Sequence, residues 1–417
     1  MMKEILVYAD WIELPDMMQM GILRTQISKG EEIFSFEDSK KWLESGYAQD
    51  IDPDLKLFTG PQYLNDEKPN FGIFLDSSPD RWGRMLMKRR EAIKEREVGE
   101  KPKNLYESDF LVGVNDETRM GGIRFKLHEE GDFLEHGETV KAPPITSIRE
   151  LEQASLRIED DDFYKDDNAK KWLNLMMAPG SSLGGARPKA SVRHTDGSLW
   201  IAKFPSKNDD KDSGIWEFLV NRIAKTVNIN VAEASAAIFS QKQHTYLTKR
   251  FDRSIEDKRL HFASAMTLLG YKDGYSHKEG GSYLEIVDLI ETYGASPKVD
   301  LIELWRRIVF SVGVSNTDDH LRNHGFILTR KGWNLSPAYD INPNESGAGL
   351  SLNISENDNS LDYDLCLSIA EYFRWEQKDA KSYIKKVRKE ISYWSKIANE
   401  LKISNGEQNF MEKAFNI

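Results

Sequence analysis

Residues 315–326 read SNTDDHLRNHGF and follow directly on an apolar stretch of the chain. In that stretch, apolar side chains recur at the three- and four-residue spacing of a helix face, which predicts a helix buried on one side. The positions on this face are Leu301, Leu304, Trp305, Ile308, Val309 and Val312. Binding and catalytic residues often lie in polar loops that a rigid element positions, so residues 315–326 are the first candidate for a site.

Two polar residues of this loop, Asp318 and Asn323, are five positions apart. Protein kinases use this Asp-to-Asn spacing in their catalytic loop, where the Asp orients the attacking hydroxyl group or accepts its proton, and the Asn oxygen binds Mg²⁺. Seventeen residues beyond Asn323, Asp340 closes the run LSPAYD and can be a second magnesium ligand. Asp319 is a second acid beside Asp318, and the five-residue spacing to Asn323 favours Asp318 as the catalytic one.

The two histidines of the loop allow other interpretations. His320 can order the loop through hydrogen bonds or transfer a proton, and both roles stay open, so we include it among the catalytic candidates. His320 and His324 are four positions apart, a spacing that suits zinc on a helix. Leu321 stands where a metalloprotease motif needs Glu, and the neighbouring residues indicate a loop, so a zinc site is disfavoured.

Upstream of this loop, residues 200–205 read WIAKFP and predict a strand that ends near Lys203. A strand lysine can reach the α- and β-phosphates of ATP, and Glu217 on the next predicted helix is placed to pair with it. Taken alone, each of these residues is typical of a surface charge. Their order and spacing relative to Asp318 and Asp340 favour nucleotide binding instead, with ATP and Mg²⁺ as the cofactors.

Residues 179–189 read PGSSLGGARPK and form a glycine-rich segment before the strand that carries Lys203. Glycines such as Gly184 and Gly185 let backbone N–H groups approach phosphate oxygens. The segment is not a Walker loop, because no Gly-Lys-Ser/Thr follows. Residues 180–184 also match the Gly-x-Ser-x-Gly elbow of hydrolases, but that elbow needs a strand before it and a helix after it. The prolines on both sides oppose this arrangement and disfavour a hydrolase.

Predicted strands come mainly before predicted helices. Strand patterns cover 188–194, 198–204, 234–239 and 245–250, with Asp196-Gly197 as a hairpin turn between the first two. Helical patterns cover 147–158 and 215–227, dominate from residue 252 onward and include a stripe from Ala380 to Leu401. This order predicts an α+β fold with the two-lobed, protein-kinase-like layout, in which a β-rich N-lobe and a helical C-lobe enclose the nucleotide.

Residues 1–145 precede this pattern and predict an additional N-terminal α/β subdomain. Strands are expected at Ile5–Tyr8 and after Gly121-Gly122, and helices at 37–45 and 80–97. The run Ala142-Pro143-Pro144 marks a boundary. The predicted domains are the N-terminal subdomain over 1–145, the N-lobe with the glycine-rich loop over 146–252, and the helical C-lobe with the catalytic loop over 253–417.

Composition narrows the classes of protein further. The 57 basic and 68 acidic side chains give a net charge of −11, which argues against charge-driven binding of the chain to DNA or acidic membranes. Cys366 is the only cysteine, so no disulfide can form within the chain. The N-terminal apolar run is only about six residues long, too short for a signal peptide. The sequence therefore predicts a cytoplasmic chain with no membrane partner.

The motifs together resemble the HipA family of bacterial toxin kinases. The match is carried by residues 181–189, 316–325 and 335–341. Residues 77–84, which read SSPDRWGR, and residues 121–125 are similar to that family's extra N-terminal subdomain. The resemblance implies that Asp318 is the catalytic Asp, that Asn323 and Asp340 are the magnesium ligands, and that Lys203 is the lysine of the ATP phosphates.

Further site residues follow from the resemblance alone. Residues 247–253 are similar to the family's linker between the lobes, whose backbone would meet adenine near Lys249 and Phe251. The family autophosphorylates a serine of its glycine-rich loop, and Ser182 matches that position best, with Ser181 next. A phosphate there would place about two negative charges where the ATP phosphates must bind, and so would switch the kinase off.

The resemblance also implies the biological setting of the reaction. Known members phosphorylate an aminoacyl-tRNA synthetase on serine or threonine, stop translation, and cause growth arrest or persistence. They are restrained by a small helix-turn-helix antitoxin, which supplies most of the DNA contact. The acidic charge of this chain fits a toxin of such a toxin–antitoxin pair that reaches DNA only through its antitoxin.

Two alternatives stay open beside the protein kinase. Catalytic loops of this type also occur in lipid and small-molecule kinases, although no basic amphipathic stretch for a lipid surface stands out. The chain could also act as a catalytically weak corepressor with a DNA-binding antitoxin. The presence of all the named catalytic residues argues against the second alternative.

Overall fold

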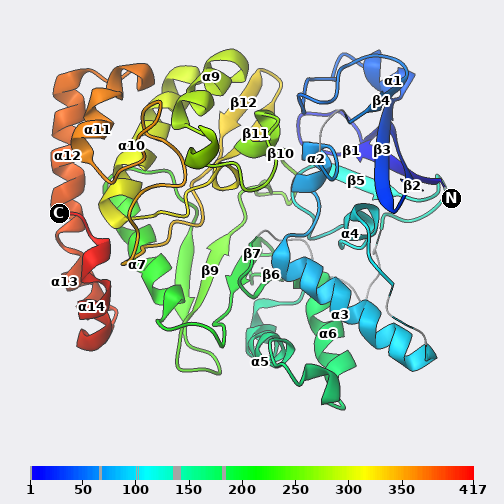
Figure 1. The fold of residues 1–417 in the computed structure, drawn as a ribbon, viewed down its shortest axis with the longest axis horizontal. Helices are drawn as coiled ribbons and strands as arrows, with labels where there is room; N and C mark the ends of the chain where they lie inside the picture. Colours follow the sequence, from blue (N-terminus) through cyan, green and yellow to red (C-terminus); the bar gives the residue numbers. More distant parts are fainter. Residues whose placement is uncertain (1, 65–67, 100, 102, 135–141, 181–184) are drawn as a thin grey trace. The chain divides into compact units, whose positions relative to one another are not determined.

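The structure is a computed structural model that describes residues 2–64, 68–99, 101, 103–134, 142–180 and 185–417. The chain folds into two compact units of mixed helices and strands (Figure 1). Unit 1 comprises Met1–Asp209 and Ile238–Ala263, and unit 2 comprises Asp210–Ala237 and Ser264–Ile417. None of the helices in these described ranges is both long and apolar enough to span a membrane. The division into domains 1–145, 146–252 and 253–417 stays a prediction.

The N-terminal part of unit 1 contains an antiparallel sheet with the strand order β4-β3-β2-β1-β5. Its strands are β1 (Lys3–Ala9), β2 (Met18–Ser28), β3 (Glu31–Asp38), β4 (Pro61–Tyr63) and β5 (Ile123–Lys126). Alternate residues of a strand face the core. Phe34 and Phe36 of β3 are therefore buried, while Ile33 points to the opposite face and is exposed. The strands predicted at Ile5–Tyr8 and after Gly121-Gly122 are confirmed.

Along the described part of the chain, four helices lie between β3 and β5. They are α1 (Lys40–Leu43), α2 (Gly72–Asp76), α3 (Arg81–Val98) and α4 (Glu107–Val112). The helix predicted over 80–97 is confirmed as α3. Asp80 caps its N-terminus, and Gly99, in the left-handed conformation, caps its C-terminus. The helix predicted over 37–45 is largely wrong. Residues 37 and 38 pair within the sheet, which leaves only one short turn, α1, after them.

Asp38, at the end of β3, gives this sheet a pH-dependent stability. Its buried carboxylate accepts a hydrogen bond from Gln62 Nε2 at 3.1 Å. Burial raises the pKa of Asp38 from 3.8 to about 6, and the hydrogen bond offsets only part of this effect. A raised carboxyl pKa favours the protonated form in the folded state, so the contribution to stability is present below about pH 4 and is lost as the pH rises through about 6.

We therefore expect Asp38→Asn to raise the urea midpoint of unfolding at about pH 7.5 and to leave it nearly unchanged at about pH 4. The Asn oxygen keeps an acceptor for Gln62, and the substitution removes only the buried charge. Urea titrations of both proteins at the two pH values measure the difference. An equal shift at both pH values would contradict the assigned cause.

The remainder of unit 1 has its own core between helices and strands. It comprises α5 (Ile148–Ile158), α6 (Ala169–Gly180), β6 (Lys189–Arg193), β7 (Leu199–Lys203) and β9 (Thr245–Lys249). The core also contains Trp82, Leu86 and Met87 of α3, which lies beside α6 (Figure 1). The strands predicted around Asp196-Gly197 are confirmed, and Gly197 makes the turn at a φ of 84°. Sequence analysis did not predict α6.

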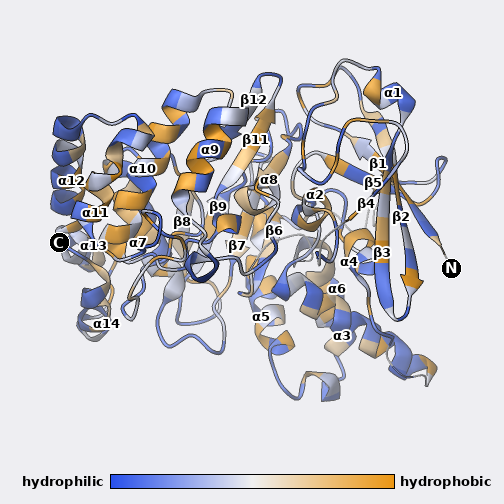
Figure 2. Ribbon diagram, turned by 45° about the horizontal axis from the view of Figure 1, so that its top comes forward, coloured by the Kyte–Doolittle hydropathy of each residue, from blue (hydrophilic) through white to orange (hydrophobic). Residues whose placement is uncertain are grey.

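Unit 2 is mostly helical. Its longer elements are α7 (Ser213–Thr226), α9 (Tyr283–Tyr293), α10 (Pro297–Val314), α12 (Gln377–Ile391), α13 (Trp394–Glu400) and α14 (Asn405–Met411). Shorter ones are β8 (Ala234–Ala237), α8 (Ala265–Leu268), β11 (Gly325–Thr329), β12 (Gly332–Leu335) and α11 (Tyr363–Ser368), and β10 (Phe262–Ser264) lies where the chain passes between the units. The colours of Figure 2 show a largely hydrophobic α10 and a more hydrophilic α12.

The two helical stripes predicted for unit 2 have different outcomes. The stripe from Leu301 to Val312 is confirmed as the buried side of α10. The stripe from Ala380 to Leu401 is divided between α12 and α13, because the first helix ends at Ile391. The predicted helical character beyond residue 252 also missed the hairpin of β11 and β12.

Candidate active site

The candidate catalytic loop begins where α10 ends. Ser315 is the C-cap of α10 and adopts the left-handed conformation with a φ of 49°. The N–H group of Asn316 still donates to the Ser311 carbonyl at 2.9 Å. The loop therefore starts from a fixed backbone position on a helix that is buried along most of its length, as a precise site requires.

The two neighbouring acids of the loop have opposite environments. The Asp318 side chain is 82% exposed, and that of Asp319 is 7% exposed. Asp319 accepts a hydrogen bond from the Tyr283 hydroxyl at 2.6 Å and one from the Ser311 hydroxyl at 3.3 Å, and it lies 2.9 Å from His324 Nε2. Burial raises the pKa of Asp319, but His324 and Tyr283 outweigh that effect and hold it below its usual value. Asp319 thus anchors the loop, and Asp318 faces solvent.

We expect Asp319→Ala to destabilise the chain by about 3 kcal/mol, because it leaves a buried hydroxyl group and a buried imidazole without their charged partner. Asp318→Ala is the matched control, one residue away and exposed, with an expected change of less than about 0.5 kcal/mol. Urea unfolding of the three proteins, followed by tryptophan fluorescence, measures both values. Equal stability of the two variants would refute the anchoring role of Asp319.

Asn323 is hydrogen-bonded directly to the loop segment that carries Asp318. Its Nδ2 donates to the Asp318 carbonyl at 2.8 Å, which leaves Oδ1 as the side-chain acceptor. A single 3₁₀ turn over Leu321–Asn323 sets this geometry, since the Asn323 N–H group donates to the His320 carbonyl at 2.8 Å. His320 Nε2 lies 3.9 Å from Asp318 Oδ1. His320 is therefore close to the candidate catalytic carboxylate, and both of its possible roles stay predictions.

The β11–β12 hairpin brings the chain back from Asn323 towards Asp340. The pairing of Phe326 with Leu335 continues into a hydrogen bond from the Ser336 N–H group to the Gly325 carbonyl at 2.8 Å. Beyond the hairpin, the Tyr339 hydroxyl donates to the Arg322 carbonyl at 2.6 Å. The residues next to Asn323 and next to Asp340 are therefore joined by a hydrogen bond.

Asp340 itself has an unusual backbone. It adopts the left-handed conformation with a φ of 57°, which costs energy for residues other than glycine and is least unfavourable for Asn and Asp. Asn342 Nδ2 donates to Asp340 Oδ1 at 3.0 Å, and the Asn342 N–H group donates to Asn316 Oδ1 at 3.0 Å. The sequence motifs assigned no role to Asn316 and Asn342. The only signals were that Asn316 begins the motif 316–325 and that Asn342 directly follows the motif 335–341.

A cavity of about 520 Å³ borders the loop at Thr317, the residue before Asp318. Its other lining residues include Ser276, His277, Lys278, Ser351 and Asn359. The Ser351 hydroxyl donates to the Thr317 carbonyl at 2.8 Å, so the cavity wall is bonded to the loop. Thus Asp318, Asn323, the segment of Asp340 and this cavity form one candidate site within unit 2.

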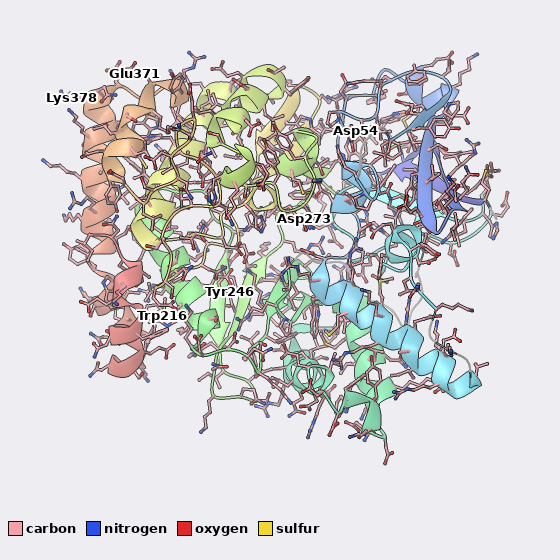
Figure 3. All side chains as sticks on the ribbon, in the orientation of Figure 1. Asp54, Trp216, Tyr246, Asp273, Glu371 and Lys378 are labelled. Atoms are coloured by element: carbon pink, nitrogen blue, oxygen red, sulfur yellow. The ribbon has the colours of Figure 1, made fainter. Side chains whose placement is uncertain are left out.

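Unit 1 holds the candidate nucleotide-binding lysine. Lys203 ends β7 directly opposite Lys189 of β6, and the two residues are only 8% and 5% exposed. Lys203 Nζ lies 5.7 Å from the ring centroid of Tyr246, a β9 residue labelled in Figure 3. Gly185 has a φ of 88°, and a Cβ there would lie 2.5 Å from Lys189 Nζ. Sequence analysis gave Lys189 no role, although the predicted turn at Asp196-Gly197 sets its pairing with Lys203.

The remaining predicted residues lie in different places. Glu217 is on α7 of unit 2 and is only 6% exposed, so it is not a surface acid. Its pairing with Lys203 stays a prediction. Lys249 is the last residue of β9, opposite Trp200, and the Phe251 ring lies 6.0 Å from that of Phe262. Their adenine contact stays a prediction. Gly184, Ser181 and Ser182 lie outside the described residues.

Residues 250–253, directly after β9, carry a buried charged cluster that the sequence motifs did not reveal. Asp252 accepts hydrogen bonds from Arg250 Nε at 2.8 Å, from Arg253 at 2.6 Å and from the Gly121 N–H group at 2.9 Å. Arg250 also donates to the Thr118 carbonyl at 2.6 Å. We call Arg250, Asp252 and Arg253 the clamp. The clamp fastens residues 118–121 of the N-terminal region to residues 250–253 within unit 1.

Comparison with known proteins gives the chain its family. Residues 181–395, more than half of the chain, match the model of the HipA-like C-terminal domain. A protein of Haemophilus influenzae named "putative kinase" is 26% identical over 180 residues, which cover 39% of this chain and 52% of that protein. One of Sinorhizobium fredii, also named a putative kinase, is 32% identical over 161 residues, covering 35% of this chain and 37% of that protein. This chain therefore spans about half or less of these relatives' length.

A solved structure extends the likeness over the whole fold. A chain of the toxin–antitoxin complex of HipA, HipB and operator DNA from Shewanella oneidensis MR-1 superposes with a TM-score of 0.67 at 18% identity. The superposition covers 98% of this chain and 94% of that chain, so the two share a fold. The resemblance inferred from the sequence motifs is thereby confirmed, and this chain belongs to the HipA family.

Proposed function

We propose that this chain is a serine/threonine protein kinase that uses ATP and Mg²⁺ and acts as the toxin of a toxin–antitoxin pair. The observation that carries the proposal is the arrangement in unit 2, where the exposed Asp318 is hydrogen-bonded to Asn323 through its carbonyl, and Asp340 is bonded to the same loop through its neighbours. This arrangement supports phosphoryl transfer, since it would pair a proton acceptor with two oxygen ligands for a metal ion.

The residues present fit a magnesium ion. Asn323 offers Oδ1, because its Nδ2 is used by the Asp318 carbonyl, and Asp340 offers a carboxylate. Mg²⁺ prefers hard oxygen ligands and keeps several waters, so one amide oxygen, one carboxylate and phosphate oxygens suffice. Asn323 and Asp340 would hold the ion, which supplies charge stabilisation to the transferred phosphoryl group.

The residues present also fit a nucleotide triphosphate. Two buried lysines, Lys189 and Lys203, lie opposite each other on neighbouring strands, so two ammonium groups are available to phosphate oxygens. Gly185 lies against Lys189 in a conformation that favours glycine, and a Cβ there would lie 2.5 Å from Lys189 Nζ. We propose that these residues bind the ATP phosphates, that Glu217 holds Lys203 in register, and that the backbone near Lys249 and Phe251 meets adenine.

Within this proposal, Asp318 orients the acceptor hydroxyl and accepts its proton as the hydroxyl oxygen bonds to the γ-phosphorus of ATP, while the bond from that phosphorus to the β,γ-bridging oxygen breaks and ADP leaves. The exposed carboxylate suits this role, because an incoming protein side chain can reach it. The cavity beside Thr317 would receive the residues next to the acceptor. His320, close to Asp318, would either orient the carboxylate or take part in proton transfer.

The proposed targets follow the family. We propose a translation-related substrate such as an aminoacyl-tRNA synthetase, and autophosphorylation at Ser182 or Ser181, with growth arrest or persistence as the result. A HipB antitoxin and operator DNA accompany HipA in the Shewanella complex. With a net charge of −11, this chain would reach DNA through such a basic partner. The reaction would take place in the cytoplasm, where ATP and the translation machinery are found.

The test is transfer of radiolabel from γ-labelled ATP by the purified chain, with Mg²⁺ and with excess EDTA. Label on the chain itself or on a cytosolic protein, lost with EDTA, is the expected result. Label confined to added lipid or small molecules would favour the alternative kinase classes. No binding of Mg-ATP in a calorimeter would favour a corepressor without catalysis and would overturn the proposal.

A further inference from the structure

The glycine-rich segment is held at both of its ends by the start of α3, a part of the N-terminal region. Asp80 Oδ2 accepts a hydrogen bond from the Gly185 N–H group at 2.6 Å, and the Trp82 N–H group donates to the Gly185 carbonyl at 3.2 Å. The Trp82 indole Nε1 donates to the Lys189 carbonyl at 3.0 Å. Both peptide groups of Gly185 and the start of β6 are thus bonded to residues that lie about a hundred positions earlier.

The other end of the segment meets the same surface. A Cβ on Gly180, the last residue of α6, would lie 2.9 Å from Leu86 Cδ1 and 3.1 Å from Trp82 Nε1. A side chain at this position would force the Leu86 methyl group to move and would crowd the Trp82 ring, so glycine favours this close approach. Gly180 and Gly185 therefore both pack against the first two turns of α3.

Residues 80–86 form a rigid support. Trp82 is 2% exposed and belongs to the core that α3 shares with α5, α6 and the strands of Lys189 and Lys203. Arg84 forms a bidentate pair with Glu107 at 2.5 and 2.6 Å and donates to the Pro79 carbonyl at 2.9 Å. Buried rings and bidentate pairs keep a single geometry, so the support can fix the backbone that rests on it.

The two carboxylate oxygens of Asp80 have separate tasks. Oδ1 accepts from the Arg81 N–H group at 2.8 Å as the N-cap of α3, and Oδ2 accepts from Gly185. A serine or asparagine would cap the helix equally well, but it offers only one side-chain oxygen. The carboxylate is the group that serves both the helix and the glycine.

We propose that Asp80 and Trp82 are positioning residues for ATP, which hold Gly185 and the start of β6 in place and thereby fix the Lys189 side chain that binds the phosphates. The proposal rests on the proposed kinase function and gives the N-terminal region a part in it. A lysine that binds the phosphates not transferred holds them equally before and during the transfer. Loss of the support should therefore weaken ATP binding and leave the chemical step largely intact.

Steady-state kinetics of phosphorylation, with ATP varied, tests this expectation. Asp80→Ala should raise the KM for ATP about tenfold and change kcat by less than about threefold. Asp80→Asn, which keeps one oxygen and the helix cap, should raise KM by a smaller factor. Hydrogen exchange of the peptide that contains Gly185, measured without nucleotide, should be faster in Asp80→Ala.

Ser39→Ala is the matched control, since Ser39 caps α1 of the same unit through the Trp42 N–H group at 3.1 Å. It loses a helix cap of similar strength and should leave the KM for ATP unchanged. An unchanged KM in Asp80→Ala, with a wild type that binds and uses ATP, overturns this inference and leaves the kinase proposal standing. A wild type that binds no ATP overturns the kinase proposal, and this inference with it.

Discussion

Asp318→Asn is expected to lower phosphoryl transfer by about a thousandfold and to leave the fold and ATP binding nearly unchanged. A general base raises a reaction rate by a factor of roughly 10² to 10⁴, and the Asn amide cannot accept the proton. The side chain is 82% exposed, so its charge contributes little to stability. Initial rates of label transfer, calorimetry with Mg-ATP and a urea titration together measure the three quantities.

The control for this experiment is Asp379→Asn, an exposed acid in the first turn of α12, which should retain the full rate. Undiminished autophosphorylation in Asp318→Asn would refute the assignment of Asp318. A rate lost together with the fold would instead indicate that Asp318 is structural, as Asp319 is. Of the two adjacent acids, only Asp319 is buried, so a loss of rate with an intact fold is expected for Asp318 alone.

Asp252→Ala is expected to destabilise the chain by about 3 to 5 kcal/mol, the largest effect on stability that we predict. Asp252 is 1% exposed and neutralises Arg250 and Arg253, which are also buried. Burial raises the pKa of Asp252, but the two guanidinium groups outweigh it and hold the pKa well below 3.8. Removing the carboxylate takes the counter-charge from two buried guanidinium groups and the acceptor from the Gly121 N–H group. The stabilisation it gives is present above about pH 4 and is lost only in strong acid, as the pH falls through the lowered pKa.

Urea unfolding of the full chain at neutral pH measures this loss. Glu4→Ala serves as the control, because Glu4 forms a half-exposed pair with Arg24 at 2.8 Å in the same unit, and such pairs contribute about 0.5 kcal/mol. A loss of less than about 1 kcal/mol in Asp252→Ala would contradict a structural role for the clamp. The expected result would mean that the contact of residues 118–121 with residues 250–253 stabilises unit 1.

The local elements of this chain could be predicted because their signals are local. The apolar spacing from Leu301 to Val312 identified α10, and the turn at Asp196-Gly197 located β6 and β7. The failures arose where long-range pairing overrode a local pattern. Residues 37 and 38 are drawn into the sheet by β2 and β4, and β11 and β12 form a hairpin inside a mostly helical unit.

By itself the sequence determined the family, the end of α10 and the five-residue spacing of Asp318 and Asn323, because these depend on residues close together along the chain. Only the tertiary structure decided that Asp319 is buried against Tyr283 and His324 while Asp318 is exposed. It also decided that the Asp80 carboxylate accepts a hydrogen bond from the Gly185 N–H group. Such contacts join segments far apart in sequence, and their energies depend on burial and hydrogen-bond geometry, which residue order along the chain does not specify.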